Sequence, residues 1–284
     1  MTPSPFVSYA QNAEDVVLHR VLGDLTTGHY LEIGAGHPTN GSISRPFYDR
    51  GWSGITVESM VNLVEAHRVE RPRDIQVHAV AGRAGTEREI LGVTPADAEV
   101  RSLTVDQILE QNHHGQLHFA VIDTPGSAGD SLAGFDLHHW RPWVLVVRTT
   151  APISNEPSDA VWEPHVLESR FQFCLFDGLS RFYVADEHAD DLRRRLSFPA
   201  NVLDRYVNHR DLETRELASS LTDEVVRWRT AALTRWATAV SKTSRSAEDE
   251  RLISLLRTEL DSTHRTVSWR VTAPLRTVRK LFPR

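Results

Sequence analysis

The segment Tyr30–Pro38, which reads Tyr-Leu-Glu-Ile-Gly-Ala-Gly-His-Pro, decides the fold class of this 284-residue chain. Its first four residues suit a buried strand, and the strand ends in a Gly-x-Gly turn formed by Gly34 and Gly36. Glycines at the carboxyl end of a parallel strand let a ligand approach the backbone, and open α/β sheets bind ligands at that edge. A nicotinamide dinucleotide fingerprint needs a third glycine at position 39, but this residue is Thr39, so a pyrophosphate-binding turn is disfavoured.

An acidic residue follows at the end of the next apolar run. Glu58 lies 24 residues after Gly34, directly after Gly54–Val57. A carboxylate in that place offers two oxygens side by side, which can accept hydrogen bonds from both hydroxyls of a ribose. A Gly-x-Gly turn with such an acid suits S-adenosylmethionine, because this nucleoside cofactor carries no phosphate. A structural turn beside a solvated glutamate is the alternative interpretation of the same residues.

Residues 1–210 alternate short apolar runs with segments of helical spacing. Short continuous apolar strands separated by helices predict a parallel sheet covered on both faces. The last two runs flank Asp177-Gly178-Leu179-Ser180, and an Asp-Gly turn between strand-forming runs predicts an antiparallel hairpin. The predicted strands are Tyr30–Ile33, Gly54–Val57, Ile75–Ala81, Leu117–Ile122, Trp143–Val147, Phe171–Phe176 and Arg181–Ala185, and the predicted helices include Asp15–Leu22, Val61–Arg68 and Leu103–Asn112.

Residues 211–284 contain no convincing strand and are predicted to form a helical extension. Apolar residues recur at roughly helical spacing as far as Val240, and Arg251–Leu260 forms a second helical segment. The polar stretch Ser241–Ala247 is expected to separate the two helices, and Pro274 interrupts the basic segment that follows. The predicted domains are therefore residues 1–210 and residues 211–284.

Composition and charge exclude several classes of protein. The chain is 40% hydrophobic and 25% charged, which suits a globular fold, and its single cysteine, Cys174, rules out an intramolecular disulfide. The apolar runs are far shorter than the roughly 20 residues that span a bilayer. Met1–Phe6 lacks the features of a signal peptide, so a cytoplasmic location is expected. The net charge of −6 argues against a nucleic-acid partner.

The carboxyl-terminal segment Ser262–Arg284 differs in charge from the rest of the chain. It carries six basic residues and no acidic one, so that the net charge of −6 for the whole chain becomes −12 for residues 1–261. Apolar residues are interspersed with the cations, and a basic amphipathic segment can lie on an anionic membrane surface. The segment is therefore expected to make peripheral contact with a membrane, and docking on the acidic remainder of the chain is the alternative.

Five stretches lie in collinear order over about residues 5–207: Phe6–Val16, Gly34–Pro38, Phe47–Gly54, Arg141–Trp143 and Phe176–Val184. Together they resemble the FkbM-type S-adenosylmethionine-dependent methyltransferases. The resemblance implies a doubly wound, mostly parallel seven-stranded Rossmann-like methyltransferase sheet that ends in an antiparallel hairpin. It also implies O-methylation of sugar or related hydroxyls in glycan and natural-product pathways, with S-adenosylmethionine as the cofactor.

Position in the predicted sheet and the resemblance together give the candidate site residues. Asp123, at the carboxyl end of the fourth predicted strand, is the candidate general base, and His37, in the glycine turn, is the second catalytic candidate. The candidate cofactor-binding residues are Tyr9, Gln11 and Asn12, which would cover the cofactor from the N-terminal segment, together with Glu32, Gly34, Ala35, Gly36, Ser42, Glu58, Ser59 and Asp123.

The chain departs from the family pattern at the catalytic end of the sheet. The family usually has an acid where this chain has Pro125, and a glutamate after the fifth strand, where Arg148 follows Val147. A divalent metal needs hard oxygen ligands, and such a site keeps only Asp123 here, which argues against a metal cofactor. An added guanidinium would also repel a sulfonium cofactor. These departures predict a degenerate catalytic site.

Two functions follow from these observations. The leading hypothesis is an S-adenosylmethionine-dependent O-methyltransferase that acts on a sugar hydroxyl of a surface glycan, a glycolipid or a secondary metabolite. The alternative is a catalytically impaired relative that serves as a binding or scaffold module in glycan biosynthesis, and Pro125 and Arg148 favour it. Residues 262–284 would attach either protein to the inner membrane face or to glycan-assembly machinery. The acceptor and the oligomeric state are left open.

Overall fold

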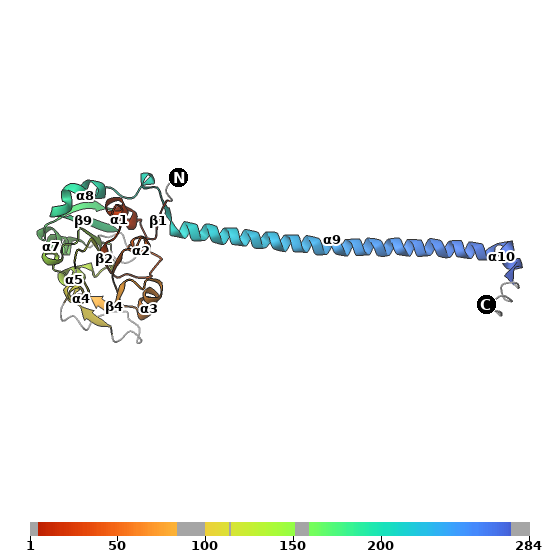
Figure 1. Ribbon diagram of the computed structural model, residues 1–284, viewed down its shortest axis with the longest axis horizontal. Helices are drawn as coiled ribbons and strands as arrows, with labels where there is room; N and C mark the ends of the chain where they lie inside the picture. The colour runs from red at the N-terminus through yellow and green to blue at the C-terminus, as the bar shows by residue number, and fades with distance from the viewer. Residues whose placement is uncertain (1–4, 84–99, 114, 151–158, 274–284) are drawn as a thin grey trace. The chain divides into compact units, whose positions relative to one another are not determined.

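The computed structural model describes residues 5–83, 100–113, 115–150 and 159–273 (Figure 1). The chain divides into two units, Met1–Thr214 and Arg215–Arg284. The first unit holds the strands and short helices, whereas the described part of the second unit is helical. None of the described helices combines the length and apolar character that crossing a bilayer requires.

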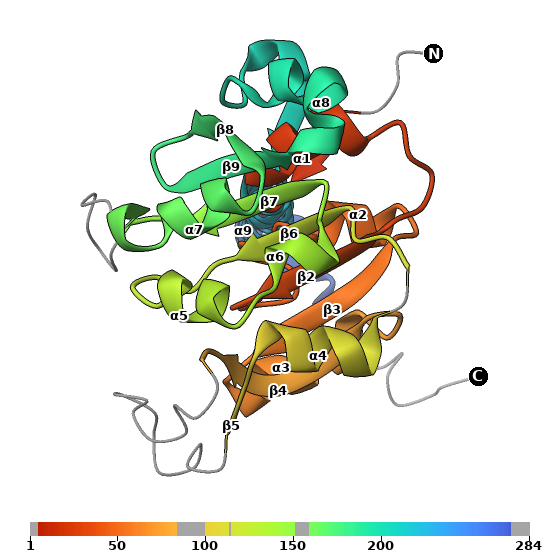
Figure 2. The same ribbon diagram turned by 90° about the vertical axis from the view of Figure 1, so that its left-hand side faces the viewer.

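The first unit is built on an eight-stranded sheet (Figure 2). The strand order is β5-β4-β3-β2-β6-β7-β9-β8. Neighbours from β5 to β7 run parallel, and β9 runs antiparallel to both β7 and β8. These strands are β2 His29–Ile33, β3 Ser53–Glu58, β4 Ile75–Ala81, β5 Arg101–Leu103, β6 Phe119–Ile122, β7 Val144–Arg148, β8 Phe171–Phe176 and β9 Ser180–Ala185. The predicted mostly parallel Rossmann-like sheet with a closing antiparallel hairpin is confirmed.

The predicted hairpin turn is formed by the Asp-Gly pair, Asp177 and Gly178. Asp177 Oδ1 accepts hydrogen bonds from the N–H groups of Leu179 at 2.9 Å and Ser180 at 2.7 Å. Gly178 takes a φ of +103°, which a residue with a side chain rarely adopts. The turn therefore returns the chain directly from β8 into β9.

The sheet has one strand more than the seven predicted. The additional strand, β5, lies at the edge and pairs with β4, and it contains Leu103, which the helical spacing assigned to the start of a helix. Thr104 is instead the N-cap residue of α4. Its hydroxyl accepts the N–H of Gln107, and the Gln107 side chain accepts the N–H of Thr104. This capping box fixes the first helical residue at Val105, so the residues before it are free to extend the sheet. A separate two-stranded parallel sheet joins β1 Phe6–Ser8 to β10 Tyr206–Asn208.

Helices cover both faces of the main sheet. Alternation along β2 sends Leu31 and Ile33 to one core cluster and Tyr30 to the other. The first cluster contains residues of α4, α5, α6 and α7, and the second contains residues of α1, α2 and α8. The helix bounds are α1 Glu14–Leu22, α2 Arg45–Asp49, α3 Val61–Glu70, α4 Val105–Asn112, α5 Ala128–Ala133, α6 Leu137–Trp140, α7 Glu163–Glu168 and α8 Ala189–Leu196.

A single helix replaces the two that were predicted in the carboxyl-terminal part. Helix α9, His209–Arg265, runs without interruption through Ser241–Ala247, so the predicted break there is wrong. That stretch is polar but contains neither proline nor glycine, and Thr243 donates its hydroxyl hydrogen bond back to the carbonyl of Ala239 at 3.0 Å. Helix α10, Val267–Val271, follows after the N-cap residue Thr266. The predicted interruption at Pro274 lies outside the described residues.

Candidate functional site

A cavity of about 340 Å³ lies at the carboxyl ends of β2, β3, β4 and β6. Four of the predicted site residues line it: Gly34, Glu58, Ser59 and Asp123. Its apolar walls come from Ile33, Val57 and the end of β4, Ala79–Ala81, and Thr124, Pro125 and Ser127 complete the rim. The carboxyl ends of adjacent parallel strands meet at one edge of a sheet, which is where open α/β folds bind ligands.

The turn after β2 is shaped by two glycines with different requirements. Gly34 takes a φ of +73°, and a Cβ at this position would lie 2.2 Å from the backbone oxygen of Asp123. Gly36 takes a φ of +59°, but a Cβ there would meet no atom within 4 Å. The sequence predicted that both glycines serve the approach of a ligand. In the structure, the absence of a side chain at Gly34 allows the turn to pack against the backbone of Asp123, directly after β6.

Glu58 forms part of the cavity wall and is almost fully buried. Its Oε2 accepts the N–H of Gly36 at 2.9 Å, and its Oε1 accepts the N–H groups of Ser59 at 2.8 Å and Met60 at 2.9 Å. A carboxylate has about four acceptor positions, so these backbone donors leave one, on Oε2. Glu58 can therefore receive one further hydroxyl on Oε2, and a second would have to displace a donor from Oε1, which the Ser59 hydroxyl also approaches at 3.3 Å.

Asp123 lines the cavity and also contacts Arg148, which does not line it. Asp123 Oδ1 is 3.5 Å from Nη1 of Arg148, and the same Nη1 donates to Oε1 of Gln11 at 2.9 Å. Burial raises the pKa of Asp123, and the guanidinium of Arg148 works in the opposite direction. Arg148 thus offsets part of the rise in the pKa of Asp123 that burial causes.

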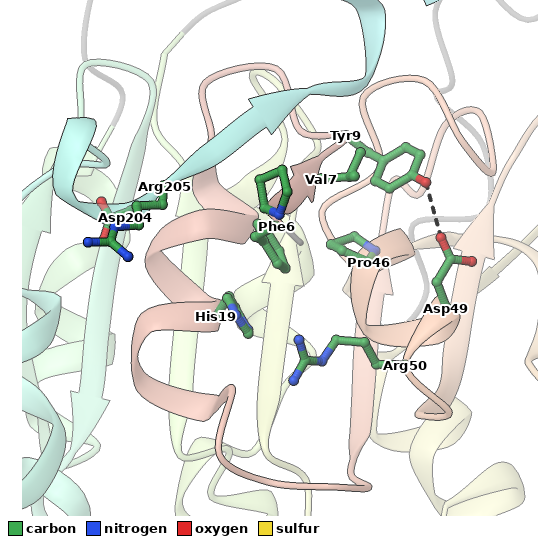
Figure 3. Close-up of a pocket in the computed structure, with 10 residues that line it drawn as sticks. Phe6, Val7, Tyr9, His19, Pro46, Asp49, Arg50, Asp204 and Arg205 are labelled. Carbon is green, nitrogen blue, oxygen red and sulfur yellow. Dashed lines mark hydrogen bonds between the residues drawn. The ribbon is translucent and has the colours of Figure 1, made fainter. Parts of the chain in front are cut away.

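The three residues predicted to cover the cofactor separate in the structure. Gln11 contacts Arg148, and Asn12 donates through Nδ2 to the carbonyl of Asp177 at 3.0 Å, so both lie near the ends of β7 and β8. Tyr9 instead lines a different cavity (Figure 3), where its hydroxyl donates to Asp49 at 3.1 Å. The cofactor contacts of all three residues stay predictions.

This second cavity, of about 680 Å³, is larger but is not at the strand ends. It lies among β1, α1, α2 and the 3-10 turn Val202–Asp204, and the ring of Phe6 stacks on His19 at 4.2 Å. Three of its charged side chains, Asp49, Arg50 and Asp204, already have partners within the chain. Asp204 pairs with Arg20 at 2.7 Å, and Arg50 donates to the carbonyl of Gly23 at 3.0 Å. The smaller cavity therefore remains the candidate site.

Glu32 and Ser42 belong to a buried polar cluster behind the glycine turn. Glu32 accepts the N–H of Ile43 at 3.0 Å and the hydroxyls of Ser42 and Ser44. The fully buried Arg71 donates to Ser42 at 3.0 Å and to Ser44 at 2.6 Å, and its guanidinium is 3.8 Å from Glu32. Both predicted residues thus fix the segment that follows the turn, and neither lines the cavity.

The remaining predicted residues, Ala35 and His37, also lie outside the cavity lining. Ala35 donates its N–H to the carbonyl of Val57 at 3.1 Å, which ties the turn to β3. The exposed His37 accepts the N–H groups of Thr39 at 3.1 Å and Asn40 at 3.2 Å through Nδ1. This leaves Nε2 as the protonated nitrogen, so His37 could reach a ligand only as a hydrogen-bond donor. Its catalytic role stays a prediction.

Two features were missed at the sequence level, the cavity wall Ala79–Ala81 and the buried acid Glu14, which does not line the cavity. The wall Ala79–Ala81 had a signal, because a parallel strand that ends in small residues beside the glycine turn makes room for a flat ring. Glu14 had none, since an acid in the first turn of a helix is an ordinary sequence feature. It is buried beside Asp177, and burial raises its pKa to about 8.

Within residues 5–83, 100–113, 115–150 and 159–273, no three His, Cys, Asp or Glu side chains are placed to hold a metal ion.

Comparisons with known proteins find likeness only among solved structures. No family model and no curated protein matches the chain. A TehB-like S-adenosylmethionine-dependent methyltransferase from Corynebacterium glutamicum is 11% identical with a TM-score of 0.36, and the match covers 60% of this chain and 87% of that one. An O-methyltransferase from Bacillus cereus in complex with S-adenosylhomocysteine is 17% identical with a TM-score of 0.38, covering 60% and 78% of the two chains. Likenesses this distant carry no functional argument, so the function is argued from the geometry of the cavity at the strand ends.

Proposed function

We propose that this chain is an S-adenosylmethionine-dependent O-methyltransferase. The observation that carries the proposal is the position of Glu58, at the end of β3, in a cavity that begins at the glycine turn after β2. One acceptor position on its Oε2 is left for a ribose hydroxyl. The cavity volume of about 340 Å³ falls in the range of small-molecule sites.

The residues that line the cavity fit the proposed cofactor. Val57, Ala79 and Ala81 offer an apolar wall for a purine ring, and Glu58 offers the ribose acceptor. When bound, S-adenosylmethionine supplies an electrophilic methyl group. The residues of this chain bind the cofactor, orient an acceptor hydroxyl and accept the proton of that hydroxyl. Positioning alone can supply much of the rate of such a transfer.

Asp123 is the proposed proton acceptor. It lines the cavity, and burial raises its pKa toward the range in which a carboxylate accepts a proton more readily. The guanidinium of Arg148, 3.5 Å from Asp123 Oδ1, opposes this rise in the pKa and favours the charged form. The proposed acceptor substrate is a sugar hydroxyl of a glycan, a glycolipid or a secondary metabolite, a choice that rests on the resemblance of the five stretches to FkbM-type enzymes.

The first test is the contribution of Glu58 to cofactor binding. Glu58→Ala is expected to weaken S-adenosylmethionine binding by about 1.5–3 kcal/mol, which is roughly ten- to 150-fold in the dissociation constant, because a charge-assisted hydrogen bond is lost. Isothermal titration calorimetry with S-adenosylmethionine and S-adenosylhomocysteine measures the effect. Glu58→Gln should lose less, since an amide keeps one acceptor oxygen.

The control for this test is a measurement of whether each variant is folded, made by urea unfolding. A folded Glu58→Ala protein with an unchanged dissociation constant would refute the ribose assignment. Absence of binding of both ligands to the unaltered chain would refute the cofactor and the enzyme together.

The contact between Arg148 and Asp123 favours a second candidate function, a binding or scaffold module in glycan biosynthesis. A cation 3.5 Å from the proposed base disfavours a sulfonium nearby and lowers the affinity of the base for a proton. The same titration separates the two functions when it is combined with a transfer assay on glycan fractions. Binding with methyl transfer supports the enzyme, and binding without transfer on any fraction supports the module.

We also propose that residues 262–284 attach the protein to an anionic membrane face or to glycan-assembly machinery. The proposal rests on the six basic residues and the interspersed apolar ones. Removal of residues 262–284 is expected to abolish most co-sedimentation with anionic vesicles at low salt, because each cation near the surface contributes about 1 kcal/mol. Cofactor binding should be unchanged in the shortened protein. Equal sedimentation of both proteins would exclude the membrane role.

A further inference from the structure

Helix α9 carries apolar side chains for which the described contacts offer no cover. Every described side chain from Glu213 to Val271 is exposed, leaving aside residues 244–246. Isolated helices owe little stability to backbone propensity alone, and most helices in proteins are stabilised by packing an apolar face. A 57-residue helix with this surface therefore needs a partner along its length. Its exposed apolar residues include Leu217, Leu221, Val225, Trp228, Leu252, Ile253, Leu256 and Leu260, with exposures between 49% and 73%.

The spacing of these residues indicates the kind of partner. Leu252, Leu256 and Leu260 repeat Leu217, Leu221 and Val225 at an interval of 35 residues, which is five heptads. A straight helix drifts by about 20° per heptad, so five heptads would turn the second group about 100° away from the first. A left-handed supercoil removes this drift and brings both groups to one face. The pattern therefore predicts a coiled coil in which Leu221 and Leu256 occupy a positions and Leu217 and Leu252 occupy d positions.

Charges between the two apolar groups distinguish the possible pairings. A parallel, in-register pair of identical helices would set each charged seam residue against its own copy, and these six residues are Glu224, Arg235, Lys242, Arg245, Asp249 and Glu259. An antiparallel pair that places Leu217 opposite Leu256 and Leu221 opposite Leu252 has fewer conflicts. It sets Arg235 opposite Thr238 and Lys242 opposite Ala231, and only Glu224 and Asp249 keep like charges together.

We propose that α9 forms an antiparallel coiled coil with α9 of a second copy of this chain. The first apolar group of each copy covers the second group of the other, so both groups are buried by one interface. The occupant is a second copy because the two groups occur on one helix, share one heptad frame and place the same residue, leucine, at their a and d positions. The residues that carry the interface all lie within the second unit, Arg215–Arg284.

The test is the mass of the full-length chain in solution. Sedimentation equilibrium at micromolar concentration is expected to give twice the mass of one chain. Leu221→Lys and Leu256→Lys, each at an a position, are expected to shift the protein to monomer. Leu233→Lys is the matched control, because Leu233 is equally exposed, at 54%, but lies at an f position outside the seam. A monomeric unaltered chain, or equal dissociation by Leu233→Lys, would overturn the proposal.

Cross-linking tests the antiparallel direction in a Cys174→Ser background. A mixture of Leu217→Cys and Leu256→Cys chains is expected to form disulfide-linked dimers of one chain of each kind under mild oxidation. Each variant alone is expected to remain uncross-linked, because position 217 lies far from its own copy in the antiparallel pair. Cross-linking of each variant with itself would overturn the arrangement.

Discussion

Replacement of Arg71 by methionine is expected to lower the free energy of unfolding by about 3–5 kcal/mol. Arg71 is fully buried, and its guanidinium donates to Asp74 at 2.8 Å and to the Tyr30 hydroxyl at 2.9 Å. Its removal leaves the buried carboxylates of Asp74 and Glu32 without a cation, and breaking a buried pair from one side costs this much. Urea unfolding at pH 7 measures the change.

Arg68→Met is the matched control for this prediction. Arg68 lies one turn before Arg71 and pairs with Glu65, but both side chains of that pair are more than half exposed. Exposed pairs contribute about 0–1 kcal/mol, so this variant should unfold almost as the unaltered chain does. Burial raises the pKa of Asp74 and of Glu32. Lower pH should therefore reduce the loss in Arg71→Met, because these carboxyl groups then take up protons. Equal stability of the two variants would contradict the prediction.

Glu14→Gln is expected to make the protein more stable at pH 9 and almost unchanged near pH 5. Burial, with a smaller effect of Asp177, raises the pKa of Glu14 from 4.5 to about 8. A raised carboxyl pKa means that the folded chain holds its proton more tightly than the unfolded chain. Stability is therefore lost as the pH rises from about 4.5 to about 8. Such a shift corresponds to about 3–5 kcal/mol, and glutamine, which cannot ionise, avoids this loss.

Urea unfolding at pH 5 and pH 9 tests this expectation, with Glu187→Gln as the control. Hydrogen bonding to Arg141 lowers the pKa of Glu187 to about 2, so this group is charged throughout the range and its replacement should shift both values equally. Parallel pH profiles for the unaltered chain and Glu14→Gln would show that Glu14 does not carry a proton in the fold.

The sheet could be predicted because its strands have local signatures. Central strands such as β6 and β7 are buried on both faces and read as continuous apolar runs, and the Asp-Gly turn identified the hairpin. The edge strand β5 has only three residues and is extended because it pairs with β4. No local sequence pattern indicates this pairing. The continuity of α9 was missed because polarity was read as a break, although a helix ends for steric or capping reasons.

The candidate site was predictable in position more than in detail. Gly34, Glu58 and Asp123 end three neighbouring strands, and strand order alone brings them to one cavity. The number of acceptor positions left on Glu58 depends on the backbone path of Ser59 and Met60, which residue types do not reveal. The role of Arg71 was invisible for a related reason, since an arginine after a helix is as a rule exposed, and only the tertiary fold buries this one.

The unequal surroundings of the two turn glycines have a consequence for how this sequence can drift over generations. At position 36 the backbone is left-handed but the space beside it is open, so asparagine or aspartate could replace the glycine at modest cost. At position 34 the missing Cβ is occupied by the backbone of Asp123, which cannot rotate away as a side chain could. A lineage descending from this protein could thus lose the Gly-x-Gly signature through its second glycine and still keep the cavity, whereas any substitution of the first would remodel the junction of β2 and β6.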